Sequence, residues 1–337
     1  MSYIYVNEQG SQISVSGGYC VITVLNGEKN LVPIETIEGV SVFGNINITT
    51  PALQMFMKNN ITVTLYSRKG SYFGRIMSNE NVNIIRQRKQ FRLSGNTEFS
   101  LNLSKSILRA KIHNQAVVLS RYCPETNDNE VIRNLISQIK IIAKIIDRCV
   151  SIGQLMGYEG IAARYYFQGL SECVSPEFKF SGRSRRPPKD AFNSMLSLGY
   201  SLLLNEIYGA AEGKGLNVYA GFLHQDRERH PTLASDLMEE WRSVIVDSVV
   251  LSLVNGHEVH IDGFTKSDAG VFLDNDTFKV FIKKYENKLN TLTRYLSYED
   301  NSDSKISFRR ALGLQTEMLA KAVDNEDSGW YKPIYIR

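Results

Sequence analysis

Two stretches of the chain concentrate residues able to do metal or phosphate chemistry, and the first is MGYEGIAARYYFQGL, residues 156–170. Helical spacing places Glu159 of this stretch on the same face as Leu155 and Ala162. An ionised carboxylate on such an apolar stripe is costly unless it meets a cation or strong donors, and a metal ion is one such cation. The alternative is a position at the edge of the stripe, where Glu159 pairs with a neighbour such as Arg164. This segment alone leaves both interpretations open.

The second stretch, GFLHQDRERHPTLASDLMEEWRS, residues 221–243, brings a histidine and carboxylates together. Asp236 and Glu239 are three residues apart, so a helix places them on one face, and His224 arrives from a preceding loop. One imidazole and two carboxylates could hold a divalent cation. An Asp followed three residues later by a Glu is also the pattern of a capping box, which needs no metal. Capping and ligation therefore both remain open for Asp236.

A basic loop lies between these two stretches, in FKFSGRSRRPPKDAF, residues 178–192. Its cations surround a Pro-Pro pair just ahead of a predicted helix: Arg183, Arg185, Arg186 and Lys189. Arginine offers a planar fork of donors and proline limits the entropy lost on binding, so this loop suits phosphate contact. Arg227 and Arg229 add positive charge close to His224. The alternative is a solvated hinge, because charge runs usually reflect no more than solubility.

The elements that must position these residues change character near residue 80. Up to that point, β-branched and aromatic runs bounded by Gly, Asn or Ser indicate strands: SYIYV, QISVS, YCVITVL, IEGVSVFG, ITVTLYS and SYFGRIM. One helix interrupts them, TPALQMFMKNN, with Thr50 as its N-cap and Pro51 at its first position. From about Asn81 onward the apolar residues recur at three and four, which predicts helices.

We therefore predict an α+β fold of two domains, a small, mostly β N-terminal domain followed by a larger all-α domain. The expected boundaries are residues 1–80 for the β domain, 81–95 for a linker and 96–337 for the helical domain. A chain of 337 residues, 43% of them hydrophobic, is long enough for two cores. The boundary segment NVNIIRQRKQFR is either a solvated linker helix or part of a phosphate-contacting face.

Composition restricts the class of protein only loosely. A formal net charge of +4 permits a polyanionic partner but does not demonstrate one. Four cysteines lie far apart without a CxxC pair, so neither a zinc knuckle nor a disulfide framework is indicated and reduced thiols are expected. The segment MSYIYVNEQG lacks the pattern of a signal peptide, and the apolar runs are too short to span a bilayer. We expect a cytoplasmic protein with no membrane partner.

Five segments carry, in order, a family resemblance: MGYEG, FKFSGRSRRPPKDAFNSMLSLGY, GFLH, SDLMEEW and ISFRRALGLQTEMLA. After a β domain that ends in LYSRKGSYFGRI, their joint order and spacing resemble the CRISPR-associated spacer-acquisition integrases, the Cas-one (Cas1) family, over essentially the whole chain. The resemblance implies that the N-terminal β domain serves dimerisation and that the helical domain is catalytic. It also implies that a homodimer binds DNA and joins a small companion protein, Cas-two (Cas2).

The resemblance further implies a metal site. The metal ligands of the family are a Glu, a His and an acidic residue, and they fall on Glu159, His224 and Glu239, which are thereby also the predicted catalytic residues. Asp236 matches a position that is acidic in many relatives and is expected to support a ligand or to replace one. The cofactor would be Mg²⁺ or Mn²⁺, and the imidazole ligand suits Mn²⁺ at least as well as Mg²⁺.

The activity implied is a metal-dependent DNA endonuclease and integrase that inserts short DNA fragments, or spacers, into a CRISPR repeat array. The attacking group would be a 3′-hydroxyl for strand transfer or water for nicking, while the basic residues grip phosphates. The predicted DNA-binding residues are Arg183, Arg185, Arg186, Lys189, Arg227 and Arg229. Two alternatives are kept: a structure-selective DNA repair nuclease, and a non-catalytic DNA-binding scaffold in which Glu159 and Asp236 are structural.

Overall fold

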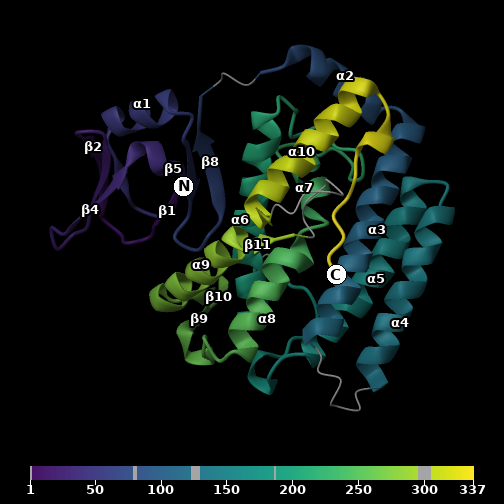
Figure 1. Cartoon of the computed structure of the whole chain (residues 1–337). Coiled ribbons are helices and arrows are strands. Elements are labelled where there is room, and N and C mark those ends of the chain that lie inside the picture. The colour runs from purple at the N-terminus through teal and green to yellow at the C-terminus, as the bar shows by residue number, and fades with distance from the viewer. Residues whose placement is uncertain (1, 79–81, 123–129, 186, 295–304) are drawn as a thin grey trace. The chain divides into compact units, whose positions relative to one another are not determined.

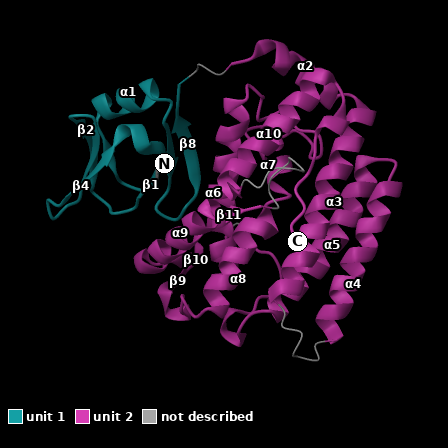
Figure 2. Cartoon of the chain, in the orientation of Figure 1, with its two compact units in different colours: residues 1–81 teal, residues 82–337 magenta. Residues whose placement is uncertain are grey.

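The computed structural model describes residues 2–78, 82–122, 130–185, 187–294 and 305–337. The chain divides into two compact units, residues 1–81 and 82–337 (Figure 2). The first unit is rich in strands and the second in helices (Figure 1). The predicted α+β class, with a β-rich region followed by a helical one, is therefore confirmed.

Unit 1 contains two sheets and one helix. Its elements are β1 (Ser2–Val6), β2 (Gln12–Ser16), β3 (Tyr19–Thr23), β4 (Lys29–Pro33), β5 (Ile37–Phe43), β6 (Asn47–Ile48), α1 (Thr50–Lys58), β7 (Thr62–Tyr66) and β8 (Tyr72–Ile76). One sheet has the order β1-β5-β7-β8, with β1, β5 and β7 parallel and β8 antiparallel to β7. The other has the order β4-β3-β2-β6, in which β2-β3 and β3-β4 are antiparallel pairs.

The core of unit 1 is formed by side chains that point to one face of its strands, since successive side chains of a strand point to opposite faces. Ile13, Val40 and Val63 are each at most 1% exposed and pack in one apolar cluster with Phe56 of α1. The cap of α1 is Thr49 rather than the predicted Thr50, because the Thr49 side chain accepts a hydrogen bond from the backbone N–H of Ala52. Strand β4, with the sequence KNLVP, was not predicted because it is polar and ends in a proline; it is an edge strand, where proline is tolerated.

Unit 2 is mainly helical. Its helices are α2 (Ile84–Ser94), α3 (Thr97–Tyr122), α4 (Glu130–Ile145), α5 (Ile152–Glu172), α6 (Ala191–Gly213), α7 (Thr232–Met238), α8 (Ser248–Asn255), α9 (Asn275–Asn290) and α10 (Phe308–Asn325). A π-helical segment, η4 (Arg242–Asp247), leads into α8. Two short hairpins accompany the helices: β9 (Phe264–Ser267) with β10 (Gly270–Leu273), and β11 (Leu292–Thr293) with β12 (Ile306–Ser307).

The long helix α3 is the centre of unit 2. It packs against α4, α5 and η4, and Figure 1 shows α3, α4 and α5 side by side. On the other side of η4, helix α6 contacts α7, α10 and β10. Trp241, fully buried just before η4, donates its indole N–H to Gln315 of α10 at 2.8 Å. These contacts fix the segment from α7 to η4 between α3 and α10.

From Val82 on, the boundary segment NVNIIRQRKQFR belongs to unit 2, and from Ile84 on it forms α2. Three of its cations pair with the C-terminal end of α10: Arg86 lies 2.6 Å from Asp324, Lys89 donates to the Asp324 carbonyl at 2.6 Å, and Arg92 pairs with Glu326. Because these guanidinium and ammonium groups already have carboxylate or carbonyl partners, they hold α2 to α10.

The cysteines correct one expectation. Cys20 and Cys149 are free and buried, but Cys173 is disulfide-bonded, with its partner outside the described residues. The expectation of reduced thiols alone was therefore wrong. Among the helices of the described ranges, none combines the length and the apolarity that crossing a bilayer requires.

Candidate active site

Glu159 of α5 and Glu239, which follows α7, both face one ammonium group. Lys111 of α3 forms ion pairs with Glu159 and, at 2.5 Å between Nζ and Oε2, with Glu239. The exposed fractions of the Lys111 and Glu239 side chains are 9% and 6%. The partner of Glu159 is thus Lys111, 48 positions earlier in the chain, and not the neighbour Arg164. Two carboxylates from different elements converge on a single cation position.

Nearby positive charges keep the buried Glu239 carboxyl ionised. Burial by itself raises its pKa, but the nearby charges of Arg242, Lys111 and His224 outweigh burial and lower the pKa to about 2. Arg242 also donates to Oε1 at 3.1 Å. The other oxygen, Oε2, pairs with the Lys111 ammonium at 2.5 Å. Both oxygens of the buried Glu239 carboxylate therefore face a cationic side chain, and Oε2 faces the one that Glu159 also pairs with.

Asp236 organises the loop that carries His224. It is fully buried, its Oδ2 accepts the backbone N–H groups of Phe222 and Leu223 at 2.7 and 2.9 Å, and its Oδ1 accepts that of His224 at 3.1 Å. The capping interpretation of Asp236 was wrong. Helix α7 begins at Thr232 after Pro231, which provides no side-chain cap, so Asp236 lies inside the helix.

The same carboxylate orients the imidazole. His224 Nδ1 is 2.7 Å from Asp236 Oδ1, so a proton on Nδ1 leaves the lone pair of Nε2 available to a metal. Burial alone lowers the pKa of His224, but the hydrogen bond to Asp236 and the charges of Asp236 and Glu239 raise it above its usual value. The charge of Glu239 is thus one of those that act on His224.

Glycine at position 221 lets the loop approach α7. A Cβ there would lie 2.5 Å from Cγ2 of Thr232 and 2.8 Å from Oδ2 of Asp236. Both distances are too short for a real Cβ contact. Gly221, the first residue of GFLH, is therefore needed for the close packing that positions His224.

Glu240, adjacent to Glu239, faces elsewhere. It accepts the Tyr331 hydroxyl at 2.5 Å and the backbone N–H of Ile334 at 2.9 Å. Burial raises the pKa of Glu240 to about 8. Glu239, and not Glu240, shares the cation position with Glu159.

Of the three predicted metal ligands, two share one cationic partner and the third is paired with a different residue. Glu159 and Glu239 are joined through Lys111, and His224 is joined to Asp236 and lies within electrostatic reach of Glu239. Within the described residues, no group of three or more His, Cys, Asp or Glu side chains stands ready to hold a metal ion. The Lys111 ammonium lies between the two carboxylates, and the ligand set stays a prediction.

The predicted phosphate-contacting residues separate into packed and exposed ones. Arg183 donates to Asn193 at 2.9 Å and to Ser197 at 3.1 Å, and its guanidinium lies over the Tyr200 ring, so it anchors the loop to α6. The exposed members are Arg185, Lys189, Arg227 and Arg229. Arg186 lies outside the described residues. The Pro-Pro pair packs on the β9–β10 hairpin, where Val271 donates to the Pro188 carbonyl at 2.9 Å.

Two cations beside the carboxylates were missed, Lys111 and Arg242. The signal for Lys111 was its place on the buried stripe of LSKSILRAKIHNQAVVL, since a lysine there needs an anionic partner. Arg242 is placed by η4, and a π-helical turn has no reliable sequence pattern; such turns frequently occur at functional sites.

Comparison with solved structures identifies the fold. The chain matches a casposase bound to an integration product with a TM-score of 0.83 and 24% identity, covering 100% of this chain and 95% of that one. It matches a chain of a Cas6-RT-Cas1–Cas2 complex with a TM-score of 0.83 and 22% identity, covering 98% of this chain and 36% of that one. The fold is that of Cas1-like proteins.

Sequence comparison identifies the family. The chain is 37% identical over 326 residues to the CRISPR-associated endonuclease Cas1 of Mycobacterium tuberculosis strain H37Rv, covering 96% of this chain and 94% of that protein. The family model described as CRISPR associated protein Cas1 matches residues 4–287. The chain belongs to the Cas1 family of CRISPR-associated endonucleases, which confirms the resemblance predicted from its motifs.

Proposed function

We propose that this protein is a metal-dependent DNA endonuclease and integrase that inserts short DNA fragments into a CRISPR repeat array. The observation that carries the proposal is the convergence of Glu159 and Glu239 on one cation position, next to a histidine oriented by Asp236. Strand transfer by this route forms a phosphorus–oxygen bond to an incoming 3′-oxygen and breaks the bond to the departing one. The number of phosphodiesters is conserved, so no external energy source is needed.

The residues present fit a divalent cation. Two carboxylates from different elements already pair with a single positive charge, the Lys111 ammonium. Glu159, His224 and Glu239 would hold Mg²⁺ or Mn²⁺, whose chemistry at this position is to polarise the scissile phosphate. Asp236 would keep Nε2 of His224 turned to the ion, and Arg242 would keep Glu239 ionised.

DNA binding is proposed for the exposed basic residues. Arg185 and Lys189 lie on the loop that Arg183 and the Pro-Pro pair hold in place, and Arg227 and Arg229 follow His224. Contacts of this kind go to phosphates, so affinity should fall steeply with salt and depend little on base sequence.

The proposed partners are DNA, a second copy of this chain and a Cas2 companion. The companion is suggested by the likeness to the chain from a Cas6-RT-Cas1–Cas2 complex, and the DNA role by the likeness to a casposase bound to an integration product. The homodimer is suggested by the exposed edge strands of unit 1.

The test is strand transfer and cleavage on a labelled branched DNA with a free 3′-hydroxyl, with a Cas2 companion, in Mg²⁺, Mn²⁺ or EDTA. The variants Glu159→Gln, His224→Ala and Glu239→Gln should lose both reactions while binding DNA like wild type in fluorescence anisotropy. Glu172→Gln is the matched control, because Glu172 is on the same helix as Glu159 but pairs with Lys179.

The outcomes separate the alternatives. Nicking without joining in the wild type would favour a repair nuclease, since water would then be the nucleophile. No reaction of any kind, with DNA binding intact, would favour a scaffold. Full activity of the three ligand variants would place the chemistry at another site and refute the proposal.

A further inference from the structure

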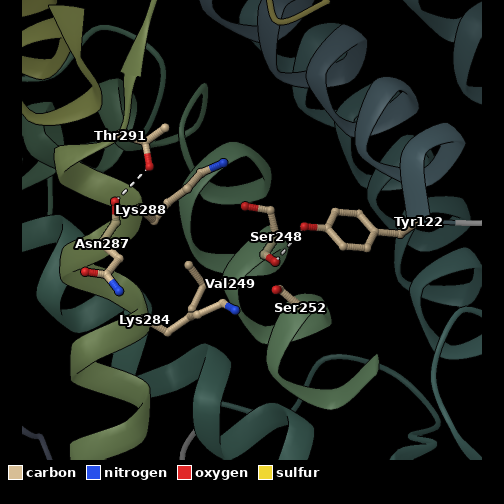
Figure 3. A pocket seen from close by; sticks show the side chains of 8 residues that line it. All are labelled: Tyr122, Ser248, Val249, Ser252, Lys284, Asn287, Lys288 and Thr291. Carbon is tan, nitrogen blue, oxygen red and sulfur yellow. Dashed lines mark hydrogen bonds between the residues drawn. The ribbon is translucent and has the colours of Figure 1, made fainter. Parts of the chain in front are cut away.

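A polar pocket lies where the C-terminal end of α3 meets α8 and α9 (Figure 3). Its volume is about 240 Å³. That exceeds the about 30 Å³ that one water occupies, but it is below the about 300–1,000 Å³ of pockets that enclose whole drug-sized ligands. Two lysines and several hydroxyl groups line it, and no carboxylate is among its lining residues. The size and the lining favour a small anionic group.

Lys288 is the lining residue with an unbalanced charge. It extends from α9 toward α8 (Figure 3), and no carboxylate of the described chain lies within ion-pair distance of it. Its ammonium lies 4.5 Å from the centre of the Phe308 ring, a contact that compensates for part of the lost hydration. Burial, together with the charge of Arg121, lowers the pKa of Lys288 to about 8. An anion bound beside the Lys288 ammonium would offset the free-energy cost of burying its charge.

The remaining lining groups add donors without adding negative charge. Lys284 is paired with Glu258, so its charge is already balanced. Tyr122 donates its hydroxyl to the Ser248 carbonyl at 3.0 Å. The Ser252 hydroxyl and the Asn287 amide make no hydrogen bond to any described residue. The pocket therefore has one unpaired cation and two uncommitted polar groups.

We propose that this pocket binds a phosphate group, with Lys288 as the counter-ion and Ser252 and Asn287 as hydrogen-bond donors. A phosphate presents several acceptor oxygens and one or two negative charges, which matches this combination. The site is separate from the proposed metal centre, because Tyr122 follows Lys111 on α3 by 11 positions, about 16 Å of helix. The phosphate could belong to a nucleic-acid backbone or to a free phosphorylated molecule.

The test uses the full chain and inorganic phosphate as the probe, with binding followed by isothermal titration calorimetry near pH 7. Saturable binding is expected for the wild type, with an affinity about tenfold or more weaker in Lys288→Gln. Lys288→Arg should retain most of the affinity. Lys283→Gln is the control, because Lys283 is exposed on the same helix and does not line the pocket. Circular dichroism confirms that each variant is folded.

A second arm identifies the source of the phosphate. The same variants are titrated with a labelled single-stranded oligonucleotide by fluorescence anisotropy. Loss of both phosphate and oligonucleotide affinity in Lys288→Gln supports the proposal and identifies the nucleic-acid backbone as the ligand. Loss of phosphate affinity alone supports it with a free phosphorylated ligand. Absence of phosphate binding in the wild type, or equal losses in Lys288→Gln and Lys283→Gln, would overturn it.

Discussion

At the scale of single residues, the Lys111 ammonium supplies the positive charge that pairs with both Glu159 and Glu239. Lys111→Met leaves the buried carboxylate of Glu239 and the partly buried one of Glu159 without their shared partner, and breaking a buried pair costs about 3–5 kcal/mol. We expect a melting temperature several degrees lower without metal. We also expect a larger rise on adding Mn²⁺ than in the wild type, because the ion no longer competes with an ammonium.

Differential scanning fluorimetry with EDTA and with Mn²⁺ measures both effects. Lys105→Met is the control, since Lys105 is on the same helix and donates to the Asp147 carbonyl at the surface, away from the two carboxylates. An Mn²⁺-induced shift that is the same in Lys111→Met and the wild type would mean that no ion binds between these carboxylates.

Asp247 provides a prediction about pH. Its Oδ1 accepts the Tyr200 hydroxyl at 2.5 Å and its Oδ2 accepts the Tyr166 hydroxyl at 2.7 Å. Burial raises its pKa from 3.8 to about 6, although the two tyrosines and the charges of Arg242 and Arg183 oppose the rise. Because the folded state binds this proton more tightly than the unfolded state, the stabilisation is complete below about pH 4 and is lost as pH rises through about 6.

The size of this effect is about 3 kcal/mol, from a pKa change of about two units. Asp247→Asn cannot titrate, so the free energy of unfolding of the wild type minus that of Asp247→Asn should decrease by about this amount between pH 4 and pH 7. Urea denaturation at several pH values measures the difference. Asp262→Asn, at an exposed position, should show no such trend; a flat difference for Asp247→Asn would contradict the buried-carboxyl account.

At the scale of elements, the contact between the GFLH loop and α7 depends on Gly221. Gly221→Ala adds a Cβ 2.5 Å from Thr232 and 2.8 Å from Asp236, so the loop must move away and His224 with it. We expect a cost of about 1–3 kcal/mol and loss of the Mn²⁺-induced rise in melting temperature. Gly313→Ala is the matched change, because nothing lies within 4 Å of its Cβ and alanine favours the helix α10.

How far the sequence predicts these elements depends on whether a signal is local. The helix carrying Glu159 follows from its apolar spacing, and the strands of unit 1 from their β-branched runs. The partner of Glu159 could not be predicted, because Lys111 is on another helix and meets it only through packing. The capping interpretation of Asp236 failed for a related reason. Helix α7 begins at Thr232, after a proline that provides no side-chain cap, and the Asp-x-x-Glu pattern lies at its end, with Asp236 in the helix and Glu239 just after it. A pattern at the end of a helix thus resembled the beginning of one.

At the scale of the whole molecule, the C-terminal segment of unit 2 packs against α3 and against Glu240, the residue next to the predicted ligand Glu239. Asn114 of α3 donates to the carbonyls of Glu240 and Ile334 at 3.0 Å, and Ile336 donates back to Asn114 at 3.0 Å. Tyr331 bonds both Glu240 and Gln315 of α10. The residue next to Glu239 is thus held by α3, α10 and the end of the chain together, which fixes the position of Glu239 from behind.

The last prediction concerns unit 1 and tests the proposed homodimer. In the described sheet, β8 is an edge strand that pairs with β7, and Phe73 on it is 73% exposed. Exposed edges and large exposed apolar side chains mark interaction surfaces. Phe73→Lys should therefore weaken self-association about tenfold or more, measured by sedimentation velocity over a concentration series.

Leu25→Lys, at an 81% exposed position in the turn between β3 and β4, should leave self-association unchanged. Equal dissociation constants for Phe73→Lys and the wild type would remove β8 from the interface, and a wild type that stays monomeric at all concentrations would refute the homodimer itself.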